Sequence, residues 1–171
     1  MNAKEIRTLQ APLKERYREQ PATARVTLRA EGHIGDGDVT CKVTTGKGPV
    51  TAGLHPATGG DGTDACSGDM LLESLVACAG VTLRAVATAM EIDIRDGTIT
   101  AEGDLDFRGT LGLSKDAPVG FEAMRLTFDL DTDATEEQVE TLLRLTKRYC
   151  VIYQTLDRAL TIDVVRKIRR R

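Results

Sequence analysis

Apolar residues in the first part of the chain recur in a helical pattern and then in two strand patterns. Four of them stand three or four positions apart, namely Ile6, Leu9, Leu13 and Tyr17. This spacing predicts an N-terminal helix over residues 6–19 that Pro12 interrupts and Pro21 ends. Residues 26–30 and 39–43 then alternate between apolar and polar side chains, with a segment rich in glycine and aspartate between them. These two runs predict a β-hairpin.

The middle of the chain combines a long loop with the most apolar stretch of the sequence. Residues 53–68 are rich in glycine and show no periodicity, and loops of this length are often functional. Residues 69–90 then predict an apolar helix of about the length of a membrane span. Glu73 and Arg84 lie within this helix, and charges inside a bilayer are costly. We therefore expect a buried helix of a soluble protein that does not contact a membrane.

The second half returns to alternation and then to a helix with a defined start. Residues 99–107 and 124–130 alternate, which predicts two strands with one solvent-facing side each. Thr135 and Gln138 have the spacing of a capping box, in which each side chain hydrogen-bonds the other residue's backbone N–H. A helix is therefore expected from Thr135 to about Arg148.

The end of the chain completes a mixed fold. Residues 150–160 predict a short helix or turn, and residues 162–168 predict a last strand. The element order is β-β-α-β-β-α-β, with one further strand allowed before the first long helix. Such an order describes an α+β fold with antiparallel sheets. A length of 171 residues suits one domain with a sizeable core.

Composition and charge exclude some partners. The net charge is −3, from 23 basic and 26 acidic residues, so we expect no nucleic-acid partner. Five basic residues near the C-terminus, Arg166, Lys167, Arg169, Arg170 and Arg171, are interpreted as a solvated tail. The first 20 residues lack the apolar stretch of a secretion signal. We therefore expect a cytoplasmic protein whose four cysteines are free thiols.

The cysteines differ in their sequence surroundings. Cys78 lies in the middle of the apolar helix, where a lone cysteine is most often a small core residue. Cys150 follows Tyr149 at a helix break, which would present its thiol. Cys41 alternates in phase with its strand and is interpreted as a core residue. Cys66 precedes a helix, whose N-terminus lowers a thiol pKa, so an accessory thiol and an inert one are both open.

No metal site is expected. The sequence contains no pair of cysteines two residues apart, and its histidines are His33 and His55. Four acidic residues, Asp129, Asp131, Asp133 and Glu140, match positions 1, 3, 5 and 12 of a calcium-binding EF-hand loop. Ala134 replaces the glycine that the loop requires at position 6, and a strand rather than a helix precedes it. These acidic residues are better explained by a strand followed by the first turn of a helix.

Two segments resemble the OsmC/Ohr superfamily (osmotically inducible protein C and organic hydroperoxide resistance proteins). The segment SGDMLLESLVACAGVTLRAVATAMEI, which contains Cys78, is similar to the central helix of that family. The segment RYCVIYQTLDRAL, which contains Cys150, resembles its second cysteine region. The resemblance covers about residues 25–168. It implies an OsmC-like domain over residues 23–171, preceded by a helical extension over residues 1–22.

The resemblance also implies a function. It implies an intertwined homodimer in which antiparallel sheets wrap long central helices, with the sites at the subunit interface. It further implies a thiol-dependent peroxidase in which Cys78 attacks an organic hydroperoxide, or hydrogen peroxide, and Cys150 resolves the sulfenic acid. No cofactor is expected beyond an external dithiol reductant. A non-enzymatic dimeric protein that binds small ligands or senses redox state is the alternative.

The sequence departs from the organic-hydroperoxide branch of the superfamily at three places. That branch uses a glutamate before the reactive cysteine, whereas Asp69 is the nearest acid here. It also uses an activating arginine, for which Arg29 is the first candidate and Arg25 the second. Val151 stands where proline usually follows the second cysteine. The chain therefore resembles a generic OsmC-like member more than a specialised organic-hydroperoxide enzyme.

Overall fold

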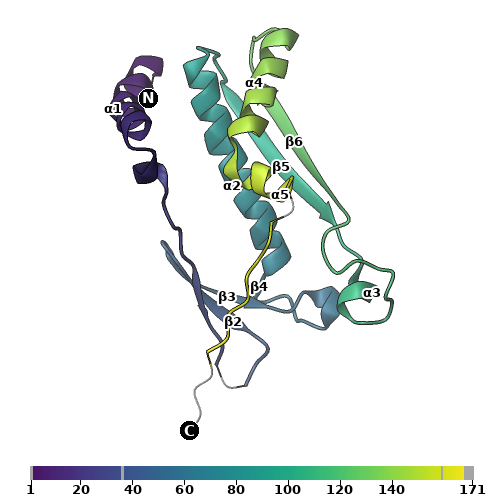
Figure 1. Ribbon diagram of the computed structural model, residues 1–171. Coiled ribbons are helices and arrows are strands. Elements are labelled where there is room, and N and C mark those ends of the chain that lie inside the picture. Colours follow the sequence, from purple (N-terminus) through teal and green to yellow (C-terminus); the bar gives the residue numbers. More distant parts are fainter. Residues whose placement is uncertain (1, 36, 159, 168–171) are drawn as a thin grey trace.

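The computed structural model describes residues 2–35, 37–158 and 160–167 and contains two small sheets and a long central helix (Figure 1). The N-terminal half contains α1 (Ala3–Glu19), the 3₁₀ turn η1 (Pro21–Ala24), β1 (Glu31–His33), β2 (Cys41–Thr45), β3 (Gly48–Gly53), the 3₁₀ turn η2 (Pro56–Thr58) and β4 (Ala65–Cys66). The C-terminal half contains α2 (Ser67–Ala89), β5 (Asp96–Asp104), α3 (Phe107–Thr110), β6 (Ala123–Asp131), α4 (Glu136–Tyr149) and α5 (Val151–Leu156).

The strands form two separate sheets. The first sheet has the order β1-β2-β3-β4, with antiparallel pairs except for β3 and β4, which are parallel. The second sheet is the antiparallel pair β5–β6, in register from Asp96 opposite Asp131 to Asp104 opposite Ala123. The predicted α+β class is therefore confirmed.

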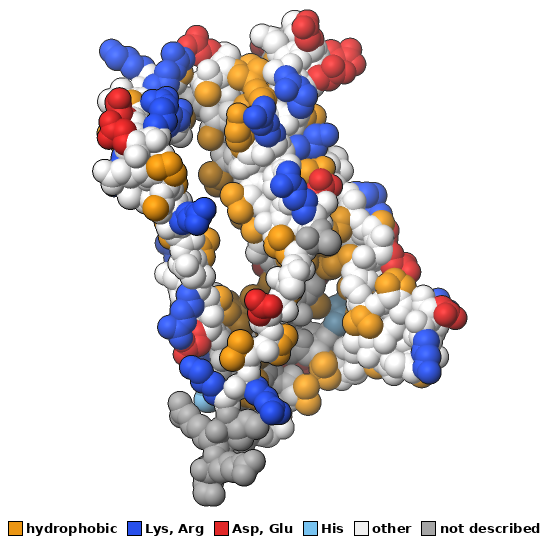
Figure 2. All heavy atoms as spheres, in the orientation of Figure 1, with side chains coloured by type: hydrophobic (Ala, Val, Ile, Leu, Met, Phe, Trp, Pro, Cys, Tyr) orange, Lys and Arg blue, Asp and Glu red, His pale blue; other side chains and the backbone are white. Residues whose placement is uncertain are grey.

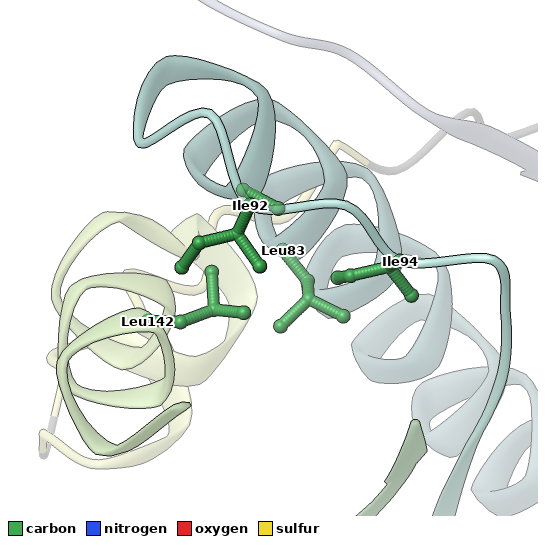
Figure 3. Close-up of a cluster of buried hydrophobic side chains, with 5 residues drawn as sticks. Leu83, Ile92, Ile94 and Leu142 are labelled. Carbon is green, nitrogen blue, oxygen red and sulfur yellow. The ribbon is translucent and has the colours of Figure 1, made fainter. Parts of the chain in front are cut away.

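The core lies where α2 meets α4 and the segment before β5. Its buried side chains are Leu83, Ala87, Ile92, Ile94 and Leu142. Figure 3 shows the labelled members pointing toward one another from the two helices and this segment. A Cβ at Gly80 would lie 3.3 Å from Cδ1 of Ile99, so the glycine allows α2 to approach β5 closely. This packing fixes the middle of α2 against α4.

Several helix boundaries follow the sequence pattern. Thr135 and Gln138 form the predicted capping box, since each backbone N–H donates to the other residue's side chain, at 2.9 and 3.3 Å. The predicted interruption at Pro12 is wrong, because α1 continues through it. Pro12 lies ten residues into this exposed helix, where it removes one backbone hydrogen bond without ending the helix. Phe107 starts α3 rather than ending β5.

Two predicted strands are not formed within the chain. Residues 26–30 form no strand, and Val26 and Leu28 are 74% and 89% exposed. Residues 162–167 also form no strand, and Val164 is 92% exposed, while Ile168 lies outside the described residues. Val39 likewise precedes β2 instead of joining it. The alternating pattern is present, but a strand needs a neighbouring strand for its backbone hydrogen bonds, and one chain supplies none here.

The apolar helix α2 is only partly covered within one chain. Among the described residues, α2 is the helix that is long and apolar enough to cross a membrane. Its buried side chains, Leu75, Ala79, Leu83 and Ala87, form one stripe, and 22% of its most apolar window is buried. The prediction of a buried helix therefore holds for one face only.

The acidic residues that resemble a calcium loop have another role. Nε of Arg95 donates to Oδ1 of Asp131 at 3.0 Å, and its guanidinium also pairs with Asp133. Hydrogen bonds from Arg95 hold the pKa of Asp131 below its usual value. Asp131 and Asp133 thus bind Arg95, which directly precedes β5.

Candidate functional site: the Cys78–Cys150 thiol pair

The fold brings together two cysteines that are far apart in the sequence. Cys78 lies half-buried in the middle of α2, and Cys150 is fully buried at the junction of α4 and α5. The backbone of Cys150 is extended, with φ −72° and ψ 112°, which ends α4 and starts α5 in a new direction. Because of this break, the first N–H groups of α5 are free of intrahelical partners and point toward the two sulfur atoms.

Hydrogen bonds from α5 and α2 converge on the sulfur atoms. The N–H of Tyr153 donates to Sγ of Cys150, with 3.4 Å between the heavy atoms. Cys78 accepts from the backbone N–H of Ile152, the thiol of Cys150, the backbone N–H of Val151 and the hydroxyl of Thr82. Cys78 therefore accepts four hydrogen bonds, one of them from the thiol of Cys150, which itself accepts a hydrogen bond from Tyr153.

The two thiols have opposite pKa shifts. Partial burial alone would raise the pKa of the Cys78 thiol, but the donors from Ile152, Cys150, Val151 and Thr82 outweigh burial and lower it. Burial is the main cause that raises the pKa of the Cys150 thiol, and the neighbouring Cys78 raises it further. Cys78 is thus the sulfur that ionises first, while Cys150 keeps its proton. A thiolate is the nucleophilic form of cysteine.

The other predicted acid and thiol lie at the far end of α2. Cys66 and Asp69 line a hollow of about 340 Å³ together with His55, whose ring stacks on Phe107 with 4.8 Å between ring centroids. Asp69 is nine residues from Cys78 on the same helix, which corresponds to about 13 Å along its axis. The structure therefore does not place Asp69 or Cys66 beside Cys78.

The candidate arginines also lie away from the thiol pair. Arg29 forms an ion pair with Glu31, and its side chain is 80% exposed. Arg25 follows η1 and is exposed. Within the described part of the chain, the donors that lower the Cys78 pKa include no arginine. Neither residue reaches Cys78 in a single subunit.

Sequence reasoning missed the backbone part of the site. It did not foresee the N–H groups of Val151 and Ile152. The available signal was the helix break at Cys150, because a helix start always presents unpaired N–H groups. Over residues 2–35, 37–158 and 160–167, no three metal-binding side chains are grouped.

Sequence comparison identifies the family. The family model described as OsmC-like protein matches residues 60–165, which include both cysteines of the pair. The chain belongs to the OsmC-like protein family. No curated protein sequence matches it. The match begins after α1 and β1–β3, so the N-terminal extension lies outside it.

Solved structures of this family share the fold at low sequence identity. An OsmC-like protein from Mycoplasma pneumoniae aligns with a TM-score of 0.64 and 16% identity, over 77% of this chain and 88% of that one. An organic hydroperoxide resistance protein OsmC from Legionella pneumophila aligns with a TM-score of 0.60 and 20% identity, over 77% and 89%. An organic hydroperoxide resistance protein from Elizabethkingia anophelis gives 0.61 and 16%, over 76% and 87%. At these identities the likeness concerns the fold.

Proposed function

We propose that this protein is a thiol-dependent peroxidase that reduces organic hydroperoxides, or hydrogen peroxide, through Cys78 and Cys150. The observation that supports it best is the hydrogen-bonded pair of thiols with opposite pKa shifts, Cys78 lowered and Cys150 raised. Membership of the OsmC-like family and the folds of two proteins named for organic hydroperoxide resistance support the same proposal.

The reaction starts with the Cys78 thiolate. Its sulfur attacks the terminal oxygen of the hydroperoxide, the O–O bond breaks, and the alkoxide leaves and takes a proton to become an alcohol. Cys78 is then a sulfenic acid. The thiol of Cys150 attacks that sulfur, a disulfide forms, and water leaves with the thiol proton and the sulfenic hydroxyl. An external dithiol then reduces the disulfide by exchange and is itself oxidised, so no bound cofactor is needed.

The structure suits this division of roles. Cys78 is half-exposed and ionises readily, as an attacking thiol must. Cys150 is buried and protonated beside it, so peroxide reaches Cys78 first. A cavity of about 520 Å³ is lined by apolar residues such as Leu75, Phe128 and Tyr153 together with Glu122, Lys147 and Asp157. Tyr153, which donates its N–H to Cys150, connects this cavity to the pair. A reducing compartment such as the cytoplasm would keep both thiols available for the next cycle.

We further propose a homodimer, which the family resemblance also implies. The segments 26–30 and 160–167 carry exposed apolar side chains and unpaired backbone groups, while β5 and β6 form a sheet of only two strands. Two-stranded sheets are marginal on their own. If these segments pair as strands with a second copy, their backbone groups gain hydrogen-bond partners and the two-stranded sheet gains further strands. Such pairing would also bring residues 25–30, which include Arg25 and Arg29, to the thiol pair of the partner subunit. Light scattering at micromolar concentration should give twice 18.5 kDa, and a monomeric mass would refute the dimer.

A non-enzymatic role remains the second candidate. The observation that favours it is the position of Arg29, paired with Glu31 and not with Cys78 in a single subunit. Without an activating cation, the thiol pair would oxidise slowly and report redox state. The two proposals differ in turnover number and not in the product.

A steady-state assay with cumene hydroperoxide and a dithiol reductant tests the function directly. The peroxidase proposal expects many turnovers per subunit, together with loss of two thiols and a Cys78–Cys150 peptide in mass spectrometry when the reductant is omitted. A disulfide that forms once, without sustained turnover, would instead favour the redox sensor. Failure to form that disulfide at all would refute both.

A further inference from the structure

The break between α4 and α5 redirects a backbone N–H group from a carbonyl to a sulfur. In a continuous α-helix the N–H of Val151 would donate to the carbonyl of Lys147, four residues earlier. The extended backbone of Cys150 prevents this and turns α5 toward the middle of α2 (Figure 1). The N–H of Val151 donates to Cys78 instead. The carbonyl of Lys147 therefore needs another partner.

The side chain of Gln154 supplies that partner. Its Nε2 donates to the carbonyl of Lys147 at 2.9 Å, across the break between the two helices. The backbone N–H of the same residue donates to the carbonyl of Cys150 at 3.0 Å, at the start of α5. Gln154 thus binds the end of α4 with its side chain and the start of α5 with its backbone, so it connects the two sides of the junction.

The junction lies on a charged face of the molecule. Figure 2 shows acidic side chains over the start of α4 and Lys and Arg side chains over its end, in agreement with Lys147 and Arg148 in the last turn of the helix. The bond from Gln154 to the carbonyl of Lys147 is formed within one chain and is exposed. Water can therefore replace the amide at this carbonyl, so that loss of the amide would weaken the junction without leaving a buried unpaired group.

We propose that Gln154 is a positioning residue of the thiol pair, because its amide occupies the carbonyl of Lys147 and leaves the N–H of Val151 for Cys78. Without that amide, the N–H of Val151 can return to the carbonyl of Lys147, as in a continuous helix, and Cys78 loses a donor. Loss of a donor disfavours the thiolate. This inference rests on the proposed peroxidase function and adds a residue that acts on Cys78 through the backbone of Val151.

Two variants of Gln154 and a control in the same short helix test the inference. Gln154→Leu removes the amide, and Gln154→Ala removes it without adding apolar volume. Thr155→Val is the control, because it removes the hydrogen bond from Oγ1 of Thr155 to the carbonyl of Val151, at 2.8 Å, and leaves the α4–α5 junction intact.

The measurement is the rate at which iodoacetamide alkylates Cys78 as a function of pH. Below the midpoint of the profile, both Gln154 variants should react about threefold more slowly, since one hydrogen bond changes an equilibrium by about this factor. The midpoint should move upward. Well above it, where Cys78 is fully ionised, both variants should react like the unmodified protein, whereas damage to the fold would alter the rate at every pH. Thr155→Val should match the unmodified protein throughout.

The alkylation profile requires no turnover and so separates this inference from the peroxidase proposal. In an active protein, kcat/KM for cumene hydroperoxide should fall by the same factor at the lower pH and recover at the higher pH. A shifted profile in a protein without turnover would support the role of Gln154 and contradict the peroxidase proposal. An unchanged profile in both Gln154 variants would overturn the role of Gln154 in a protein with full activity. An equal shift in Thr155→Val would also overturn it, because the effect would then belong to α5 as a whole.

Discussion

Cys150 and Cys66 occupy the same position in their helices but have different surroundings. Each is the N-cap residue, Cys150 of α5 and Cys66 of α2. The sulfur of Cys150 accepts a hydrogen bond from the N–H of Tyr153, is completely buried and faces Cys78. Cys66 makes no capping hydrogen bond and lies half-buried in a hollow at the other end of α2.

The comparison shows what makes a thiol pair. A helix start supplies N–H donors in both places, yet only the α4–α5 junction places a second sulfur within hydrogen-bond reach of those donors. This junction exists because α4 packs its buried residues, Leu142 and Thr146, against the rest of the core and then breaks at Cys150. The pair is therefore a product of tertiary packing rather than of local sequence.

Replacing the attacking sulfur should have the largest effect. Cys78→Ser should abolish peroxide turnover, because a hydroxyl cannot reach the sulfenic and disulfide states. Circular dichroism should show an unchanged fold, since the side chain is half-exposed and nearly the same size. Sustained turnover by a folded Cys78→Ser protein would exclude Cys78 as the nucleophile.

Replacing the two N-cap cysteines tests the comparison itself. Cys150→Ser should react once with peroxide and leave a sulfenic acid on Cys78, which dimedone traps and excess peroxide oxidises further. Cys66→Ser is the matched control and should retain turnover within about twofold, because Cys66 lies about 18 Å along α2 from Cys78. If Cys66→Ser instead prevented disulfide formation, the two helix starts would have been assigned the wrong roles.

The sequence predicts the centre of the molecule better than its margins. The periodicity of α2, the alternation of β5 and β6 and the capping box at Thr135 all describe elements that find a hydrogen-bond partner within the chain. The segments 26–30 and 162–167 have equally good strand patterns but form no strand. Alternation indicates which side chains are buried. A strand also requires a neighbouring strand, and the sequence does not indicate whether that strand belongs to the same chain.

The candidate site was likewise predicted in part. The resemblance to a family identified Cys78 and Cys150, while spacing alone favoured a core role for Cys78. Asp69, the nearest acid, and Arg29, the first candidate arginine, do not reach Cys78 in a single subunit, because nine helical residues separate Asp69 from the thiol and Glu31 pairs with Arg29. Backbone donors at residues 151 and 152 take their place. Such donors have no sequence signature, since every residue except proline has one.

The acidity of Cys78 provides a smaller and more specific test. Since hydrogen bonds lower its pKa, its alkylation by iodoacetamide should stay fast at pH values below the ordinary thiol pKa of about 8.5, and should fall only as pH drops through the lowered value. Thr82→Val removes one donor, so the midpoint of the pH profile should move upward. Peptide-resolved mass spectrometry compares Cys78 with Cys66 in the same sample. An identical midpoint in Thr82→Val would show that the hydroxyl does not act on the thiolate.

Cys41 should show the smallest effect of the four cysteines. It lies in β2 opposite Ala52, as the strand pattern predicts, and is half-buried rather than part of the described core. Its sulfur fills the space beside Gly32, where an added Cβ would approach it to 2.7 Å. Valine fills nearly the same volume and favours strands, so Cys41→Val should fold and should cost about 1 kcal/mol or less of unfolding free energy. Urea unfolding measures that cost, and peroxidase assays should match the unmodified protein. Loss of turnover in a folded Cys41→Val protein would give this thiol a chemical role and would mean that the pair at the α4–α5 junction does not act alone.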